Sequence, residues 1–280
     1  MTANREQVIL VTGATDGIGR ETALALARRG ARVIVHGRSA ARAEETTAAL
    51  AALGEGAPPP LDPLVVDLAR LADVRAAPAI LEGRGVSVDV IVNNAGVYLR
   101  EPARSADGFE LTFAVNHLAP FALTHALLSS PAGARLRRVV NVSSIAHRRA
   151  ELVLDDLSFD RRGFDGYGTY AASKLANVIF TVELARRLAG RGVMVNALHP
   201  GVVSTKLLTE GMGARGRDSL GEGAATSVRL ALDADLDGVT GGYFVDGRLA
   251  GRSPAAEDRE LARRFYEISA DLAGVTPLPA

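Results

Sequence analysis

Short apolar runs alternate with longer segments of helical periodicity along the whole chain. Runs rich in Val, Ile and Leu are typical of buried strands, whereas apolar residues that recur at helical spacing indicate helices. Strands that alternate with helices favour βαβ units and a parallel sheet covered on both faces. The predicted strands, about seven in number, are Val8–Val11, Arg32–His36, Leu64–Val66, Val88–Val92, Arg138–Val142, Val193–Ala197 and Tyr243–Val245.

The segments between these strands complete a pattern typical of an α/β protein with a Rossmann-type, doubly wound parallel sheet. No repeat or linker interrupts the pattern, so we expect one domain over residues 1–280. The predicted helices are Ile18–Arg29, about Ala40–Leu53, about Leu111–Leu128, Tyr167–Ala189 and a C-terminal helix with Ser253 as N-cap and Pro254 as its first residue.

Two segments interrupt the alternation of strand and helix. Residues 145–166 are charged and contain Phe159 and Phe164, and residues 204–223 are rich in glycine and arginine. Both follow the carboxyl ends of predicted strands, where open α/β sheets bind ligands. We expect substrate-binding loops here; the alternative is irregular surface.

Composition narrows the class of protein. Hydrophobic residues make up 48% and charged residues 23%, and the formal net charge is zero. A neutral chain has no broad attraction to nucleic acid or to an anionic membrane. The absence of cysteine excludes disulfides, thiolate chemistry and cysteine-ligated zinc, and we predict no metal site. Residues 1–7 are polar and show no signal peptide or membrane anchor, so we expect a cytoplasmic protein.

A glycine-rich turn lies between the first predicted strand and helix. It reads Thr12-Gly13-Ala14-Thr15-Asp16-Gly17-Ile18-Gly19. Glycines allow positive φ and close approach of the backbone, and the helix that follows presents free N–H groups and a positive dipole end to a pyrophosphate. The turn therefore predicts a dinucleotide site; the alternative is a tight strand-to-helix connection.

The end of the second predicted strand bears on the choice of dinucleotide. It reads His36-Gly37-Arg38-Ser39, with no acidic residue. An acid at this point binds the hydroxyls of the adenosine ribose, whereas an arginine accommodates a 2′-phosphate. The pattern favours NADP(H) over NAD(H).

Tyr170 and Lys174 form the clearest candidate for chemistry. The chain has 32 basic residues but only two lysines, Lys174 and Lys206. Residues four apart share a helix face, so a phenol and an ammonium are predicted to lie side by side. A nearby positive charge favours the phenolate, and the pair therefore suits acid/base work. Tyr167 is a competitor, but its neighbour four residues on is Ala171.

The order of motifs along the chain resembles the short-chain dehydrogenase/reductase family over nearly its whole length. The motifs are the glycine turn, Asp67-Leu68, Asn93-Asn94-Ala95-Gly96, Asn116, Val142-Ser143-Ser144, Tyr170/Lys174 and Pro200-Gly201-Val202-Val203-Ser204-Thr205. The resemblance implies an NADP(H)-dependent enzyme that interconverts a carbonyl and an alcohol.

The resemblance also implies roles for single residues. Tyr170 is the proton donor or acceptor, Lys174 lowers its pKa and holds the nicotinamide ribose, and Ser144 binds the reacting oxygen, with Ser143 as the competitor. Asn116 anchors a water that connects Lys174 to solvent. His117, His147 and His199 are expected to pack or to support loops. The cofactor-binding residues so implied are Gly13, Thr15, Asp16, Gly17, Ile18, Gly19, Arg38, Asp67, Leu68, Asn94, Ala95, Gly96, Tyr170, Lys174, Pro200, Gly201, Val203 and Thr205.

A narrower resemblance links the chain to the retinol dehydrogenase-like branch of this family. It is visible in residues 141–147, 173–180, 183–187 and 199–201 and in the C-terminal part of the chain. Members of that branch often carry a membrane anchor, and we see none here. Phe159, Phe164 and Leu207-Leu208 suggest a medium-sized, fairly apolar substrate. By resemblance, the protein forms a homodimer or homotetramer through the helices that hold Asn116 and Tyr170.

Other functions fit the same motifs. A related enzyme could reduce an activated C=C bond or use transient oxidation for epimerisation. A regulatory protein could bind NADP(H) without turnover, although such proteins commonly lose the tyrosine or the lysine.

Overall fold

The strands form one sheet in the order β3-β2-β1-β4-β5-β6-β7-β8. The computed structural model describes residues 6–279, so the expectation based on residues 1–7 falls mostly outside the described part. Neighbouring strands are parallel except for β8, which pairs antiparallel with β7. This order is that of a doubly wound Rossmann-type fold, as predicted. The strands are β1 Val8–Val11, β2 Arg32–Gly37, β3 Leu64–Val65, β4 Val90–Asn93, β5 Arg138–Val142, β6 Met194–His199, β7 Tyr243–Val245 and β8 Arg248–Leu249.

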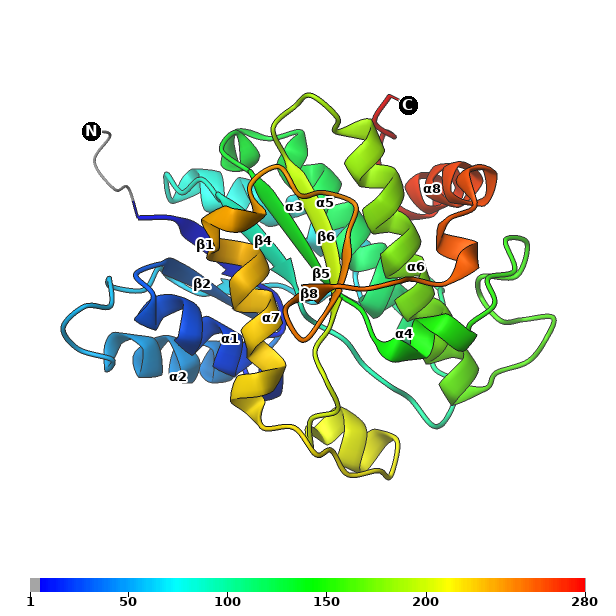
Figure 1. The fold of residues 1–280 in the computed structure, drawn as a ribbon, viewed down its shortest axis with the longest axis horizontal. Coiled ribbons are helices and arrows are strands. Elements are labelled where there is room, and N and C mark those ends of the chain that lie inside the picture. Colours follow the sequence, from blue (N-terminus) through cyan, green and yellow to red (C-terminus); the bar gives the residue numbers. More distant parts are fainter. Residues whose placement is uncertain (1–5, 280) are drawn as a thin grey trace.

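Helices cover both faces of the sheet (Figure 1). Residues of α1, α2 and α7 share one apolar core with the strands, and residues of α3, α5, α6 and α8 share the other. Because both faces are covered, the central strands β1, β4 and β5 are buried along their whole length. The helices are α1 Gly17–Arg28, α2 Ala40–Ala51, α3 Leu71–Gly83, α4 Leu111–Phe113, α5 Ala119–Leu128, α6 Gly166–Arg187, α7 Leu220–Leu232 and α8 Arg259–Ala273.

The register of the strands brings the candidate residues to one edge. Val11, at the end of β1, is level with Val35 of β2 and with Val92 of β4. The loops that follow these strands therefore start side by side. This is the carboxyl edge of the sheet, where open α/β sheets bind ligands.

The predicted helix Leu111–Leu128 contains a π-helical turn at Ala114–Leu118, between α4 and α5. π-helical turns inside α-helices occur often at functional sites, and this one carries Asn116. The segment is long and apolar enough to cross a membrane, but 78% of it is buried inside the protein. A helix buried to this extent is a core helix.

Some elements differ from the predictions. Neither α3, which contains Pro78, nor α7 was predicted, and α7 begins at Leu220 inside the segment expected to be a loop. The proposed start of the C-terminal helix is wrong. Pro254–Ala256 form a separate 3₁₀ turn, and α8 begins at Arg259, capped by the carboxylate of Asp258.

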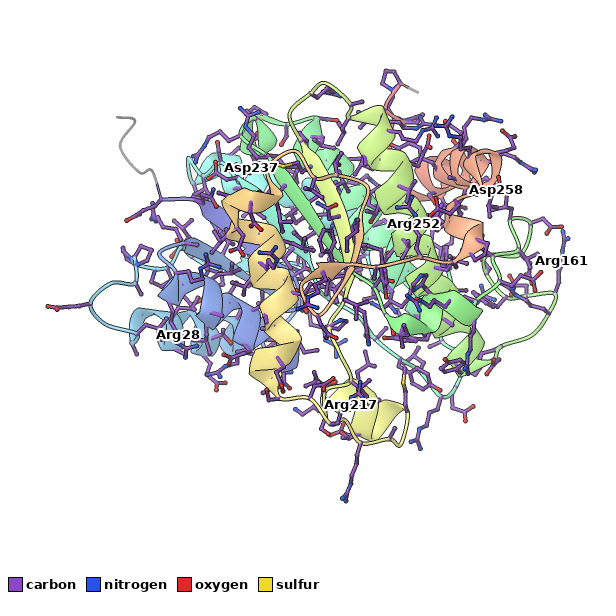
Figure 2. The ribbon with its side chains drawn as sticks, viewed as in Figure 1. Arg28, Arg161, Arg217, Asp237, Arg252 and Asp258 are labelled. Carbon is purple, nitrogen blue, oxygen red and sulfur yellow. The ribbon has the colours of Figure 1, made fainter. Side chains whose placement is uncertain are left out.

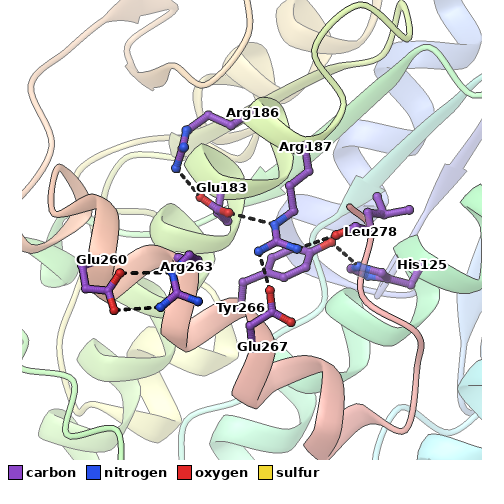
Figure 3. Close-up of polar contacts among 9 residues, drawn as sticks. All are labelled: His125, Glu183, Arg186, Arg187, Glu260, Arg263, Tyr266, Glu267 and Leu278. Atoms are coloured by element: carbon purple, nitrogen blue, oxygen red, sulfur yellow. Dashed lines mark hydrogen bonds and ion pairs between the residues drawn. The ribbon is translucent and has the colours of Figure 1, made fainter. Parts of the chain in front are cut away.

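Helix α8 is fastened to α6 by a buried ion network (Figure 3). The Arg187 guanidinium pairs with Glu183 at 2.8 Å and with Glu267 of α8 at 2.6 Å, and it donates to the carbonyl of Leu278. It also lies 4.0 Å from the centre of the Tyr266 ring. The Tyr266 hydroxyl is 2.6 Å from Nε2 of His125 on α5. Helix α8 thus covers the two helices through which an oligomer was expected to form.

Candidate active site

A cavity of about 560 Å³ runs along the carboxyl edge of the sheet. With the exception of Asn116, the predicted catalytic and cofactor-binding residues line it. These are Gly13, Thr15, Asp16, Gly17, Ile18, Gly19, Arg38, Asp67, Leu68, Asn94, Ala95, Gly96, Ser144, Tyr170, Lys174, Pro200, Gly201, Val203 and Thr205.

The glycine turn leads from β1 into α1, and the N-terminus of α1 faces the cavity. Gly17 has a φ of 53°, in the region that favours glycine. A Cβ on Gly19 would lie 2.2 Å from the carbonyl oxygen of Gly13, so only glycine permits this approach. The turn is a shallow backbone cradle at the positive end of the helix dipole, which fits the pyrophosphate of a dinucleotide.

Polar contacts from neighbouring strands hold this cradle in place. Thr12 Oγ1 accepts the backbone N–H groups of Asn94 and Ala95, each at 3.0 Å. Nδ1 of the buried His36 accepts the N–H of Gly13 at 3.1 Å. Burial lowers the pKa of His36 to about 4, so its ring is neutral and can accept this bond. The cradle is therefore built before any ligand binds.

A charged cluster surrounds Asp16, the N-cap of α1. Its carboxylate accepts the N–H of Gly17 and pairs with Lys206 at 2.9 Å and with Arg42 at 3.0 Å. The hydrogen bond from Lys206 is the largest cause of a lowered Asp16 pKa. One carboxylate with two cations leaves this end of the cavity net positive, which suits an anionic ligand.

The adenosine end of the predicted site lies beyond β2. Arg38 is exposed at the rim of the cavity, opposite Asp67 and Leu68, which follow β3. A Cβ on Gly37 would lie 2.4 Å from Cγ2 of Thr15, so the end of β2 packs tightly against the glycine turn. The one charged side chain that this strand end presents to the cavity is the Arg38 guanidinium.

Tyr170 and Lys174 lie on one face of α6 and are 7% and 3% exposed. The Lys174 ammonium is 5.6 Å from the centre of the Tyr170 ring and donates to the carbonyl of Val142, at the end of β5, at 3.0 Å. The Asp165 carboxylate caps the start of the helix. Helix α6 thus sets both groups against the end of β5.

Burial controls the protonation of both groups. It raises the pKa of Tyr170 to about 12, while a hydrogen bond with Ser144 acts in the lowering direction. It lowers the pKa of Lys174 to about 8. The net direction for Tyr170 is opposite to the one expected from the ammonium alone, because loss of water around the phenol has the larger effect. Tyr170 is therefore a protonated acid at neutral pH.

The two serines after β5 both line the cavity, but their hydroxyls make different contacts. The Ser143 hydroxyl is buried and donates to the backbone carbonyl of Lys174 at 2.7 Å. Ser144 lines the cavity beside Tyr170, and its Oγ accepts the N–H of Ala146 at 3.2 Å. Of the two, Ser144 is the residue that can reach a ligand next to Tyr170.

Asn116 lies behind the cavity and is fully buried. Its amide nitrogen donates to Val97 O and to Ser173 Oγ, each at 3.0 Å, and its Oδ1 accepts the N–H of Val97 at 2.7 Å. A Cβ on Gly96 would touch both Lys174 Nζ, at 3.3 Å, and Asn116 Oδ1, at 3.4 Å. The carboxamide thus holds the loop after β4 next to Lys174; the water relay stays a prediction.

The wall next to Tyr170 is apolar. Tyr98 packs edge-on against Tyr170, with ring centres 5.8 Å apart, and Leu207 and Met212 pack onto the same cluster. Arg100 donates to the carbonyl of Gly211 at 2.6 Å and so holds this segment over the cavity. Sequence reasoning missed Tyr98 and Met212, because neither belongs to a motif.

The two expected substrate loops contribute unequally. From residues 204–223, the part around Thr205–Leu208 lines the cavity, while Arg217 points away from the molecule (Figure 2). From residues 145–166, Ile145 and Ala146 line it. Phe159 is buried in the core, so the expectation that it faces a substrate is wrong. Among the described residues, Phe164 also lies outside the cavity lining.

Comparisons with known proteins show the family and the fold of the chain. The family model for short chain dehydrogenases matches residues 7–212. Retinol dehydrogenase 12 from Bos taurus is 38% identical over 96% of this chain and 87% of its own length. A crystal structure of an uncharacterized protein from Mycobacterium paratuberculosis has a TM-score of 0.79 at 32% identity, covering 98% of this chain and 95% of that one. A gluconate 5-dehydrogenase from Burkholderia cenocepacia, solved with NADP and tartrate, has a TM-score of 0.66 at 26% identity, covering 86% and 94%.

Proposed function

Because this chain belongs to the short-chain dehydrogenase/reductase family, in its retinol dehydrogenase-like branch, we propose that it is an NADP(H)-dependent oxidoreductase that interconverts a carbonyl and an alcohol. The substrate is medium-sized and fairly apolar. One observation carries the proposal: a protonated Tyr170, Lys174 and Ser144 share one cavity with a backbone cradle that fits a pyrophosphate.

The side chains divide the work of carbonyl reduction among them. Bound NADPH supplies the hydride. The Tyr170 hydroxyl donates its proton to the carbonyl oxygen, and its raised pKa keeps that proton in place at neutral pH. The Ser144 hydroxyl donates a hydrogen bond to the same oxygen and stabilises the charge that develops there. The Lys174 ammonium stabilises the tyrosinate left behind, since the two groups share one face of α6.

The preference for NADP(H) rests on the rim of the cavity beyond β2. Arg38 is exposed there, where a 2′-phosphate of the adenosine ribose would bind. The gluconate 5-dehydrogenase from Burkholderia cenocepacia, a structural relative, was solved with NADP. Lys206 lines the pyrophosphate end of the same cavity, and Arg42 pairs with Asp16 beside it.

The apolar wall supports the proposed substrate class. Leu207 and Met212 line the cavity and pack onto the cluster that contains Tyr170, so a polar substrate beside them would lose its hydration without replacement hydrogen bonds. An aliphatic or aromatic carbonyl compound loses little on entering such a site. Retinol dehydrogenases are among the relatives of the chain, and a long apolar aldehyde is a suitable first probe.

The central test is Tyr170→Phe, assayed by loss of NADPH absorbance over a panel of apolar aldehydes and ketones. Positioned proton transfer contributes about 10²–10⁴ in rate, and we expect kcat to fall by that factor. NADPH affinity should change little, because the ring and its packing remain. Tyr167→Phe, at the mouth of the same cavity, is the matched control and should keep its activity. A Tyr170→Phe enzyme as fast as its parent would remove Tyr170 from the mechanism.

A second test concerns the cofactor. Changing Arg38→Asp removes the cation at the ribose rim and adds a repulsive charge. We expect NADPH affinity to fall by a factor of at least about ten, corresponding to roughly 1.4 kcal/mol, while NADH affinity holds or improves. Fluorescence titration of both nucleotides measures the effect. Equal losses for the two would show that Arg38 does not recognise the phosphate.

A further inference from the structure

The turn that carries Ser144 is held from both sides by histidines that the proposed chemistry does not use. On one side, Nδ1 of His199, at the end of β6, accepts the N–H of Ile145 at 3.3 Å. On the other, Nδ1 of His147 lies 2.7 Å from the carbonyl oxygen of Ser144. His147 is fully buried, and its ring packs against Tyr243 of β7 with centres 4.5 Å apart.

The second nitrogen of His147 shows which form of the ring is present. The backbone N–H of Ser253 points at Nε2 from 3.2 Å. A backbone N–H can only donate, so Nε2 accepts and the proton of a neutral ring lies on Nδ1. That proton is then donated to the Ser144 carbonyl. Burial lowers the pKa of His147, which agrees with a neutral ring.

The residue at the far end of this link belongs to a well-anchored segment. Ser253 lies between β8 and the 3₁₀ turn Pro254–Ala256 that precedes α8, next to Arg252 (Figure 2). Arg148, the neighbour of His147, donates to the carbonyl of Gly251 at 2.7 Å, and Arg252 pairs with Glu257 at 2.8 Å. The turn after Ser144 is therefore fixed against a segment more than a hundred residues away in sequence.

We propose that His147 is a positioning residue that fixes Ser144 for the reaction by joining the Ser144 carbonyl to the Ser253 amide. The inference rests on the proposed function, in which the Ser144 hydroxyl binds the reacting oxygen. His147 touches neither substrate nor cofactor; it acts through the backbone of Ser144. Loss of this link allows the turn to shift, and a shift of about 1 Å in a catalytic group can cost roughly 100-fold in rate.

Three variants distinguish the contact of His147 with the Ser144 carbonyl from its contact with the Ser253 amide. His147→Leu fills the space but removes both hydrogen bonds. His147→Asn keeps a donor for the Ser144 carbonyl and loses the contact with Ser253. Ser253→Pro removes the same contact from the other end, and the φ of −67° at Ser253 already suits proline.

The matched control is His125→Leu. His125 is also a buried histidine that bonds a backbone carbonyl, that of Phe121 at 2.8 Å, and a group near the C-terminus, the Tyr266 hydroxyl at 2.6 Å. It lies on α5, so its loss removes comparable contacts without touching the Ser144 turn. Any effect common to both leucine variants reports on stability alone.

The measurements are kcat, KM for the aldehyde, NADPH affinity and melting temperature. We expect His147→Leu to lower kcat by up to about 100-fold with unchanged NADPH affinity. The kcat of His147→Asn and that of Ser253→Pro should fall by similar factors, because both variants remove the same hydrogen bond. Both factors should be smaller than that for His147→Leu. His125→Leu should lower the melting temperature and leave kcat as in the parent.

The proposal is overturned if His147→Leu keeps its kcat, or if His125→Leu loses as much. It is also overturned if His147→Asn and Ser253→Pro differ widely. A readout independent of turnover is the ring tautomer, followed by ¹⁵N NMR of labelled histidine: a His147 proton on Nε2 overturns the proposal even in an active enzyme. A parent protein that consumes no NADPH with any carbonyl overturns the proposed function instead.

Discussion

The Lys174 ammonium is almost completely buried, and its burial makes the stability of the fold depend on pH. Its side chain is 3% exposed, with one hydrogen bond to the Val142 carbonyl. Burial lowers its pKa from 10.5 to about 8. Between these two values the unfolded chain binds more protons than the folded one, so this group makes folding more favourable as the pH rises.

Comparison of the parent with Lys174→Met tests this. The variant lacks the titrating group, so the difference in unfolding free energy should move in favour of the parent by up to about 3 kcal/mol between pH 8 and 10.5. Tyr170 titrates higher and in the opposite sense, but it is present in both proteins. Urea unfolding at several pH values measures the difference. A difference that does not change with pH would mean that Lys174 keeps an ordinary pKa in the fold.

At the same scale, the sequence identified Tyr170 and Lys174 but not their protonation states. The spacing of Tyr170 and Lys174 follows from the helix period, and their chemical types suggest acid/base work. The pKa of each group depends instead on how β5, α6 and the loop with Tyr98 close around it. That closure is a property of tertiary packing, which no local pattern encodes. His147 was missed as a support of Ser144 for the same reason, because its partner Ser253 is remote in sequence.

At the scale of elements, the attachment of α8 to α6 depends on Arg187. Its guanidinium is 2% exposed and faces Glu183, which is equally buried, and the more exposed Glu267. Removal of one partner of a buried pair leaves the other charge without compensation. Such a loss costs about 3–5 kcal/mol.

Arg187→Met is therefore expected to destabilise the protein by about 3–5 kcal/mol and to loosen α8. Arg186→Met is the matched control: this neighbour also pairs with Glu183, at 2.7 Å, but is 46% exposed. Exposed pairs contribute about 0–1 kcal/mol. Denaturant unfolding compares the two, and hydrogen exchange follows α8 itself. Equal destabilisation by both variants would contradict a special role for the buried guanidinium.

The predicted strands had strong local signals, and two of the missed elements, α7 and β8, also had readable ones. Strand β1 is a continuous apolar run and β5 contains three valines, and both were placed correctly. Helix α7 was not predicted, although Ser219 and Glu222 form a capping box, a readable signal of a helix start. Helix α3 contains Pro78, which argues against a helix interior. Strand β8 follows Asp246-Gly247, a hairpin sequence that could have indicated it.

At the scale of the whole molecule, the covered surface of α5 and α6 bears on assembly. Within α6, Tyr167 and Arg186 are the exposed residues, and α5 has none. The rings of Phe121, Tyr266 and Phe180 pack together at the junction of α5, α6 and α8. A homodimer or homotetramer through these helices, as the family resemblance implied, would require α8 to leave this place.

We therefore expect a single chain of 29.2 kDa in dilute solution, or an assembly that uses another face. Sedimentation velocity or light scattering measures the mass. If a dimer forms, hydrogen exchange should show no added protection in α5, α6 or α8. A dimer that protects these three helices would show that α8 does not close the surface.

The scarcity of lysine gives the molecule one practical property. Of the two lysines, Lys174 is sealed in the interior, whereas the side chain of Lys206 is 67% exposed at the entrance of the cavity. Amine-directed dyes should therefore attach, apart from the chain's own α-amino group, at Lys206 alone. A fluorophore at that position would sit beside the proposed nucleotide site and should report binding there without any engineered cysteine.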